Sequence, residues 1–329
     1  MPDNFADKLA ATIIARQSQV CVGLDPRLDR MPPSLVERYR EAPRKGCGCG
    51  RHEIGACFEE FGVAIIDAVA PHAVAIKLQL ACFEQYGPPG IKAFKHLCKR
   101  AAKAGLIVIA DAKRGDIGIS AAAYSAAFIG RPQGFDGEID GFNADALTVN
   151  PLFGSDGMQP FIDDCQKYGA GIFVLVKTSN PGSAALQDLI VMAGPDSGGE
   201  TAGASGAFGG NPSKYYEKVA SLADKWGAGL IGESGYSSVG AVIGATHPET
   251  LATLRQALPH TPFLLPGYGA QGAGAADVAP AIDSSGLGAL VTASRSIIYA
   301  GAGEDFAGRA AEAAERMRVE LWQANRGNG

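Results

Sequence analysis

The stretch LIVIADAKRGD, residues 106–116, joins an uninterrupted apolar run to a dense group of charges. An apolar run of this kind is typical of a strand in a parallel sheet that is buried on both faces. Where the run ends, four charged residues occupy six positions: Asp111, Lys113, Arg114 and Asp116. Side chains two residues apart on a strand point to the same face, so we expect Asp111 and Lys113 to point one way and Ala112 the other.

Further apolar runs of the same kind recur along the chain, each followed by glycine or polar residues and then by a helical pattern. Together with the first, they predict strands over residues 19–26, 73–79, 106–113, 146–151, 171–178, 239–246, 262–269 and 288–295. Helical patterns cover residues 59–70, 90–104, 212–226, 248–257 and 306–324. Continuous apolar strands that alternate with helices indicate a parallel sheet covered on both faces. This order predicts an α/β fold of the (β/α)8 TIM barrel type, with a doubly wound open sheet as the alternative.

The composition excludes several classes of protein. A chain of 329 residues with 47% hydrophobic side chains can bury a large core. The formal net charge of −5 and the isoelectric point near 5.6 argue against a surface for nucleic acid or anionic lipid. No apolar run reaches the roughly 18 residues of a membrane helix, and the N-terminal segment does not resemble a signal peptide. We therefore expect a cytoplasmic protein whose ligand is a small molecule.

We expect a single domain over residues 1–329, with insertions in the barrel near residues 41–55 and 194–212. The second insertion is rich in glycine, which fits a mobile lid and a spacer equally. The first contains Cys47, Cys49 and His52, which together with Cys57 suggest a metal site. Their C-x-C spacing differs from that of zinc knuckles and favours a flexible surface insertion instead. Seven cysteines, an odd number in a large chain, predict reduced thiols rather than a disulfide framework.

In a barrel of this type, functional residues lie at the carboxyl ends of the strands. The polar residues that follow the predicted strands are Asp25, Lys77, Gln79, Asp111, Lys113, Asn150, residues 177–180 and Arg295. Lys77 ends the strand before Asp111, so we expect a line of Lys77, Asp111 and Lys113 in which opposite charges keep both lysines protonated. An ion-pair network that only closes the barrel end is the alternative. The convergence of so many charges at the functional face favours a catalytic site.

The order Lys77 followed by Asp111-x-Lys113-x-x-Asp116 resembles the signature of the orotidine 5′-phosphate decarboxylase family. The form DAKRGDIG, residues 111–118, is similar to that of the longer bacterial, type 2 subgroup of this family. Six other segments agree with the family in the same order, and each falls at a predicted strand end: VGLDPR (22–27), AIKLQLACFEQYG (75–87), VNPLFGSDGMQPF (149–161), KTSNPGS (177–183), LPGYGAQGA (265–273) and TASRSIIYA (292–300).

The resemblance implies decarboxylation of orotidine 5′-monophosphate to UMP and CO2, the last step of de novo pyrimidine synthesis, without a metal or an organic cofactor. It implies that Asp111 lies beside the substrate carboxylate and that Lys113 donates the proton that ends on C6. Asp25 and Lys77 match positions that bind the ribose hydroxyls. Asp116 matches a residue that reaches the ribose in the neighbouring subunit's site, which implies a homodimer with shared active sites.

The loop over residues 267–272 follows the seventh predicted strand and offers backbone N–H groups, and Arg295 ends the eighth strand beside it. Barrel enzymes commonly hold a phosphate group at this place, although a tight turn also explains the glycines. By resemblance, Gln271 matches a glutamine that closes over the phosphate and Ser179 a residue that reads the pyrimidine edge. Ser120 stands where the family usually has a ribose-contacting threonine.

Two other functions stay open at this point. Metal-dependent sugar-phosphate decarboxylases and aldol-type synthases of the same superfamily share the D-x-K-x-x-D pattern, but they place an acidic metal ligand where Lys77 stands. A lysine repels Mg²⁺ at that position. The second alternative is a catalytically silent nucleotide-binding barrel. Asp111 argues against it, because a binder of an anionic ligand has no need of a carboxylate that faces the site.

Overall fold

The computed structural model describes residues 4–44, 46, 48–192, 212–269 and 272–326. In these residues a closed barrel of parallel strands forms in the order β1-β12-β11-β10-β7-β6-β3-β2. The barrel strands are β1 (Val20–Leu24), β2 (Ala75–Gln79), β3 (Ile107–Arg114), β6 (Ala146–Val149), β7 (Gly171–Lys177), β10 (Val239–Ile243), β11 (Phe263–Pro266) and β12 (Ala289–Ala293). Each lies within or beside one predicted strand, so the TIM barrel prediction is confirmed and the open-sheet alternative is wrong.

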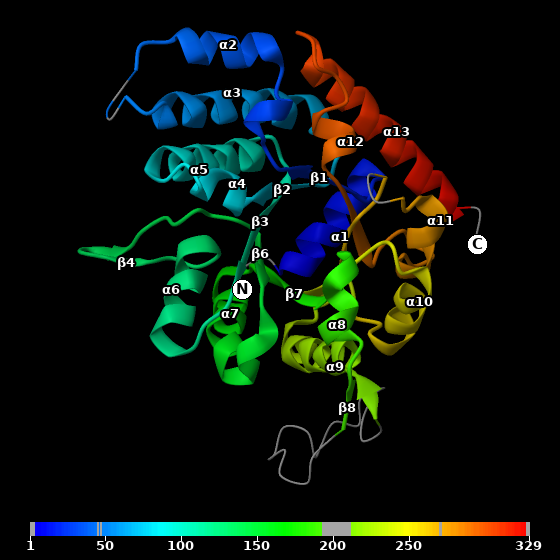
Figure 1. Ribbon diagram of the computed structural model, residues 1–329. Helices are drawn as coiled ribbons and strands as arrows, with labels where there is room; N and C mark the ends of the chain where they lie inside the picture. The colour runs from blue at the N-terminus through cyan, green and yellow to red at the C-terminus, as the bar shows by residue number, and fades with distance from the viewer. Residues whose placement is uncertain (1–3, 45, 47, 193–211, 270–271, 327–329) are drawn as a thin grey trace.

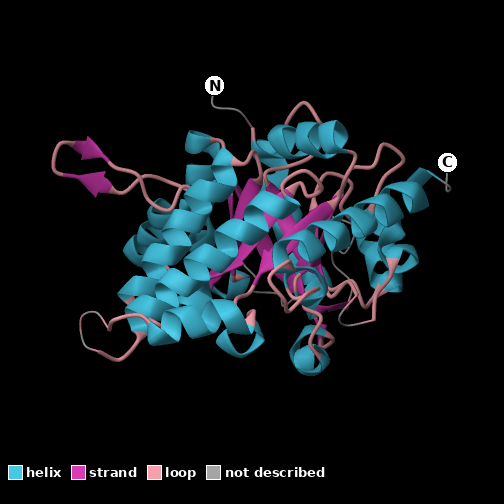
Figure 2. Cartoon of the chain, turned by 90° about the horizontal axis from the view of Figure 1, so that it is seen from above, coloured by secondary structure: helices cyan, strands magenta, loops and turns pink. Residues whose placement is uncertain are grey.

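Helices surround the strands, as Figure 2 shows from above. Their bounds are α1 (Phe5–Arg16), α2 (Pro33–Glu41), α3 (Arg51–Val69), α4 (Leu80–Glu84), α5 (Pro88–Lys103), α6 (Gly118–Phe128), α7 (Gly154–Tyr168), α8 (Ala184–Gln187), α9 (Tyr215–Gly227), α10 (Pro248–Ala257), α11 (Ala275–Val278), α12 (Arg295–Ile298) and α13 (Phe306–Arg326). Within the described ranges, none of these helices combines the length and the apolar character that a membrane span requires.

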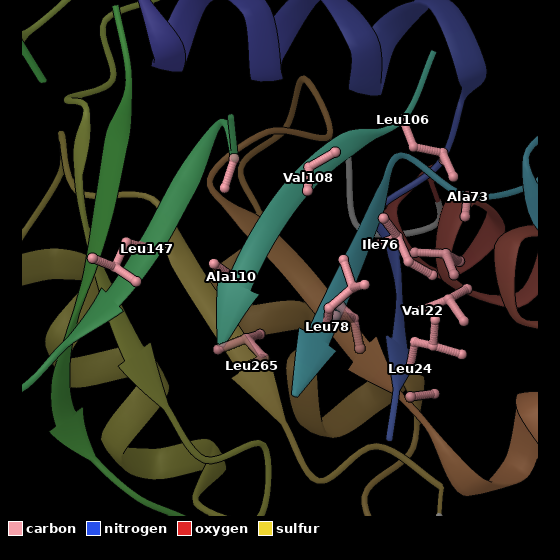
Figure 3. Packing of buried hydrophobic residues seen from close by; sticks show 14 of the residues in the cluster. Val22, Leu24, Ala73, Ile76, Leu78, Leu106, Val108, Ala110, Leu147 and Leu265 are labelled. Carbon is pink, nitrogen blue, oxygen red and sulfur yellow. The ribbon is translucent and has the colours of Figure 1, made fainter. Parts of the chain in front are cut away.

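The strand residues divide into two cores according to the face of the barrel on which they lie. In β3, Val108 and Ala110 belong to the large core between strands and helices, where Figure 3 shows them beside side chains of neighbouring strands. Ile107 and Ile109 belong to the smaller core inside the barrel. Two apolar faces explain the continuous apolar run in the sequence. The same alternation places Asp111 on the inner face, at the carboxyl end.

Helix α1 contributes to the inner core and closes the barrel at its amino end. Phe5, Leu9 and Ile13 of α1 are buried in the inner core, and the ring of Phe5 packs edge-on against Phe173 of β7 with centroids 6.0 Å apart. Gly171, the first residue of β7, lies so close that a Cβ atom there would be 2.2 Å from the Phe5 ring. With this end filled, the carboxyl ends of the strands are left for a binding site.

The first predicted insertion overlaps a helix that packs on the barrel. Residues 51–55 are the first turn and a half of α3, whose buried face includes Cys57 and Phe58, and α2 packs against α3 (Figure 1). The apolar face of α3 begins within the segment that its glycines and cysteines suggested was a loop. Cys49 is disulfide-bonded, which corrects the expectation of reduced thiols at this position, whereas five cysteines in the described part of the chain are free: Cys21, Cys57, Cys82, Cys98 and Cys165. Residues 194–211 of the second insertion, and Cys47 in the first, lie outside the described residues.

Some elements were not among the predicted ones. Helices α6 and α7 lack a clear helical pattern in the sequence: small apolar residues fill α6, and α7 contains Pro160. Two short strands, β4 (Gln133–Gly134) and β5 (Gly137–Glu138), form a hairpin that projects from the barrel in Figure 2. A second pair, β8 (Ile190–Val191) and β9 (Ser213–Lys214), follows the end of β7 and precedes α9.

Candidate active site

A cavity of about 410 Å³ opens at the carboxyl ends of the barrel strands. It brings together the predicted residues Asp25, Lys77, Asp111, Lys113, Ser179 and Arg295, and Gln79 with them. Apolar side chains from three other strands complete its wall: Leu175, Val242 and Leu264. A largely apolar pocket with a few convergent polar groups is the usual form of a small-molecule site.

The carboxylate of Asp111 stands at the centre of the charged part of the cavity. Its Oδ2 accepts hydrogen bonds from Lys77 Nζ at 2.5 Å and from Gln79 Nε2 at 3.1 Å. Its Oδ1 accepts from Lys113 Nζ at 2.5 Å and from the hydroxyl of Thr148 at 2.9 Å. The predicted line of Lys77, Asp111 and Lys113 is therefore present, and the carboxylate between the lysines is held in one orientation from both sides.

The charges of this group are set by burial and by mutual attraction. Burial alone would raise the pKa of Asp111, but the ammonium groups of Lys77 and Lys113 outweigh it and hold that pKa well below the usual value. Burial alone would lower the pKa of Lys77, but Asp111 and Asp25 outweigh it and hold that pKa above the usual value. At neutral pH the site thus presents an ionised Asp111 next to a protonated Lys77.

The backbone of β3 is irregular at the motif Asp111-x-Lys113. β3 pairs regularly with β6 up to Ala110, which lies opposite Leu147. The pairing then stops and resumes at Arg114, opposite Val149. Within the gap, Lys113 has a φ of 49°, a left-handed conformation that residues other than glycine rarely adopt. Ala112 packs against the outer core, so the predicted directions of the side chains are confirmed although the sequence did not predict the irregularity.

Asp25 follows β1 and lies at the edge of the charged group. Its Oδ1 is 3.9 Å from Lys77 Nζ and, among the described residues, is buried without a hydrogen-bond partner. The hydroxyl of Tyr299 holds the backbone here: it accepts from the N–H of Arg27 at 2.7 Å and donates to the carbonyl of Asp25 at 3.1 Å. A buried acceptor without a donor in a cavity is suited to bind a ligand hydroxyl.

The part of the cavity lined by residues after β11 and β12 is suited to an anion. Arg295, at the start of α12, lines the cavity and pairs with no carboxylate among the described residues. Gly267 and Gly269, after β11, have φ values of 108° and 69°, which explains the glycines in this turn. The Arg295 guanidinium is suited to bind a phosphate group, and from the turn Gly267 and Tyr268 line the cavity beside it, whereas the N–H of Gly269 donates to the Ala273 carbonyl. Gln271, the predicted closing residue, lies outside the described residues.

The end of β7 provides Thr178, Ser179 and Asn180 to the cavity, but Lys177 lies outside it. The pairing of β7 with β10 shifts between Val242 and Ile243, so that Lys177 stands opposite Ile243 of the outer core. Its Nζ donates to Asp188 Oδ1 at 2.8 Å on the far side of the strand. Of the polar residues 177–180 that follow this strand, Lys177 is therefore the one that does not line the cavity.

Asp116 and Ser120 also lie outside the cavity of their own chain. Asp116 Oδ1 accepts from the backbone N–H of Ile117 at 2.8 Å, and Ser120 is exposed in the first turn of α6. Large apolar side chains are exposed in the segments that follow β3 and β6: Ile117, Ile119, Leu152 and Phe153, which are 54%, 91%, 67% and 44% exposed. The two segments adjoin, since a Cβ on Gly157 would lie 2.9 Å from the Asp116 carbonyl oxygen and 2.7 Å from Phe153 Cβ.

Comparison with known proteins assigns the chain to a protein family. A family model described as "Orotidine 5'-phosphate decarboxylase / HUMPS family" matches residues 18–310. The chain belongs to this family. A protein of Rhodopirellula baltica named orotidine 5'-phosphate decarboxylase is 42% identical over 303 residues, which cover 92% of this chain and 91% of that protein. A protein of the same name from Deinococcus radiodurans is 38% identical and covers 98% of both chains.

The chain is also similar to the solved structure of Leishmania donovani OMP decarboxylase. It is 30% identical, covers 98% of both chains and superposes with a TM-score of 0.68. The resemblance inferred from the strand-end motifs is thereby confirmed at the level of the family and the fold.

Sequence reasoning missed residues that support the predicted ones. Thr148 contacts both Asp111 and Lys113, and Tyr299 holds the backbone at Asp25. A signal for Thr148 exists, because it is the one polar residue in the strand ALTV that forms β6. No comparable signal marks Tyr299. Among the described residues, no group of three or more histidine, cysteine or acidic side chains is arranged to hold a metal ion.

Proposed function

We propose that the protein decarboxylates orotidine 5′-monophosphate to UMP and CO2 with its own side chains. The observation that carries the proposal is the ionised Asp111 held between Lys77 and Lys113 at the mouth of a barrel cavity. In this proposal the substrate carboxylate lies beside Asp111, and the bond from C6 to the carboxyl carbon breaks. The electron pair stays on C6, and Lys113 Nζ delivers the proton to that carbon.

The energy required of the site decides which group matters most. An acceleration near the top of the enzymatic range corresponds to roughly 20 kcal/mol. Repulsion between Asp111 and a substrate carboxylate about 4 Å away amounts to about 4 kcal/mol at an effective dielectric constant of 20. Most of the effect must then come from the fixed ammonium of Lys113, which stabilises the developing carbanion, and from binding of the distant ribose and phosphate.

The other cavity residues take the binding roles in this proposal. The free Oδ1 of Asp25 and the ammonium of Lys77 bind the ribose hydroxyls. Arg295 and the backbone at Gly267 bind the phosphate, and Ser179 binds the pyrimidine edge. A metal-dependent reaction is disfavoured because Lys77, protonated and 6% exposed, would repel a divalent cation at this place.

We further propose that Asp116 and Ser120 act in the site of a second copy of the chain. Both lie outside their own cavity and beside exposed apolar side chains, including Ile119 and Leu152. A contiguous exposed apolar surface marks an interaction site, and a two-fold dimer would bury the same surface on both copies. The homodimer and the cytoplasmic location stay predictions.

An ultraviolet assay of the purified protein in a chelating buffer tests the reaction. We expect conversion of orotidine 5′-monophosphate to UMP at an undiminished rate after exhaustive chelation. Activity that disappears with the chelator and returns with Mg²⁺ would favour the metal-dependent alternative. UMP binding without any turnover would favour the silent nucleotide-binding barrel.

Subunit mixing tests the shared site. Asp116→Ala and Lys77→Ala chains should each be inactive alone, whereas a hybrid dimer holds one site with both residues intact. Random exchange puts half of the chains into hybrids, so we expect about one quarter of the wild-type activity per chain. Activity that stays at the level of the unmixed variants would count against Asp116 acting across the interface.

A further inference from the structure

Thr148 occupies the place where the barrel ladder is interrupted beside the catalytic motif. It is 1% exposed, and its neighbours Leu147 and Val149 both belong to the outer core. Thr148 itself lines the cavity. Three residues of β3, 111–113, stand opposite this one residue of β6, because pairing stops after Leu147 and resumes at Val149.

The two hydrogen bonds of the Thr148 hydroxyl have fixed directions. The backbone N–H of Lys113 has only a proton to give, so Thr148 Oγ1 accepts it, at 3.0 Å. The hydroxyl proton is then free to be donated, and Asp111 Oδ1, which is ionised and can only accept, receives it at 2.9 Å. Hydrogen bonds in such a chain polarise and strengthen one another.

The same Asp111 oxygen closes a ring of contacts. Lys113 Nζ donates to Oδ1 at 2.5 Å, while the backbone N–H of the same lysine donates to Thr148. Thr148 therefore holds Lys113 by its main chain, and Asp111 holds it by its side chain. The position of the ammonium relative to the carboxylate depends on both contacts.

The backbone of Lys113 needs such an anchor. Its φ of 49° is a strained, left-handed conformation for a residue other than glycine and persists only when its surroundings hold it. Regular ladder pairing with β6 is interrupted here and resumes only at Arg114. The Thr148 hydroxyl replaces a backbone carbonyl as the acceptor for this N–H group.

We propose that Thr148 is a positioning residue for the decarboxylation proposed above. Its hydroxyl fixes the left-handed backbone of Lys113 and the carboxylate of Asp111 in one mutual geometry before the substrate binds. Since a misplacement of about 1 Å at a reacting group costs about 10²-fold in rate, loss of this hydroxyl should act on kcat rather than on binding. The inference rests on the proposed function.

The variant Thr148→Val removes the hydroxyl and keeps the shape of the side chain. We expect kcat to fall about 10²-fold, while the affinity for UMP changes less than about threefold. Thr148→Ser keeps the hydroxyl and should restore kcat to within about tenfold of the wild type. A wild-type kcat in Thr148→Val, or a serine variant no better than the valine variant, would overturn the inference.

Thr261 provides a matched control outside the site. It is also 1% exposed, and its hydroxyl also donates to a carboxylate, Asp224 Oδ1, at 3.3 Å. Thr261→Val should leave kcat within about twofold of the wild type even where it lowers the melting temperature, because the group it loses is structural only. An equal loss of kcat in both valine variants would mean that the effect of Thr148→Val is a general loss of stability.

Hydrogen exchange of the wild-type chain tests the anchor without any substitution. We expect the amide of Lys113 to exchange slowly, although regular ladder pairing is interrupted there, because Thr148 accepts its proton. Exchange as fast as that of an exposed loop amide would overturn the inference. This measurement does not depend on the reaction, so a wild-type chain that fails to convert orotidine 5′-monophosphate would refute the proposed function alone.

Discussion

Two strand ends of the barrel, those of β3 and β7, carry a lysine after an apolar run and yet use it in opposite ways. At β3, Lys113 lies in the cavity with its side chain 45% exposed, and its ammonium contacts Asp111. At β7, Lys177 lies outside the cavity with its side chain 4% exposed, and its ammonium contacts Asp188. The ring of Tyr216 in α9 covers the Lys177 ammonium at 5.3 Å.

The register of each strand with its neighbour causes the difference. Where β3 leaves and rejoins β6, the residues on both sides of the gap still pair with the outward-facing Leu147 and Val149. The inward direction of Lys113 is thereby kept. Where β7 shifts against β10, Lys177 is brought opposite Ile243, which faces the outer core. A lysine at a strand end thus enters the cavity or turns away from it according to pairing that its local sequence does not reveal.

The largest expected effect is the loss of catalytic rate when Lys113, rather than Lys177, is replaced. Lys113→Ala removes both the proposed proton donor and the charge proposed to stabilise the carbanion. We expect the rate to fall by about 10⁴-fold or more, with UMP binding still measurable by calorimetry. An unchanged rate would refute the role assigned to Lys113, and with it the contrast between the two strand ends.

The reverse pattern is expected for Lys177→Met. Because Lys177 does not line the cavity and its ammonium pairs with Asp188, we expect kcat to stay within about tenfold of the wild type. Removing one partner of this partly buried ion pair leaves Asp188 with Lys214, 3.8 Å away, and should cost about 2 kcal/mol, or about 3 °C in melting temperature. Thermal unfolding monitored by circular dichroism measures the change in melting temperature. A loss of turnover as large as that of Lys113→Ala, in a chain that still melts normally, would contradict the assignment.

The sequence predicted the barrel because every strand has its own apolar run, as in LIVIA at residues 106–110. It predicted the line of Lys77, Asp111 and Lys113 because parallel strand ends meet at one edge. It did not predict that Lys177 turns away, since both breaks in register depend on how a neighbouring strand pairs. Nor did it predict that α3 begins at Arg51. The glycines and cysteines before and within this first turn are typical of a loop, and the buried face of the helix is defined only by its packing on the barrel.

The smallest expected effect is on the pH dependence of stability, and it concerns Asp111 and Asp188, the carboxylates that pair with these lysines. The pKa of Asp111 in the folded chain lies below its usual value of 3.8, since the two ammonium groups outweigh burial. The pKa of Asp188 is also lowered, chiefly by the hydrogen bond from Lys177. Each carboxylate therefore contributes stability that is fully present above pH 3.8 and is lost as the pH falls toward its folded-state pKa.

The size of this acid loss should differ between the strand ends. Asp111 is 8% exposed between two ammonium groups, whereas Asp188 is 33% exposed, so screening by water weakens its interaction. We expect Asp111→Asn to flatten the fall in unfolding free energy below pH 4 by up to about 1.4 kcal/mol per pH unit, and Asp188→Asn to flatten it less. Urea unfolding at a series of pH values measures both slopes. Equal flattening in the two variants would mean that the buried ion pair at β3 is no stronger than the half-exposed pair at β7.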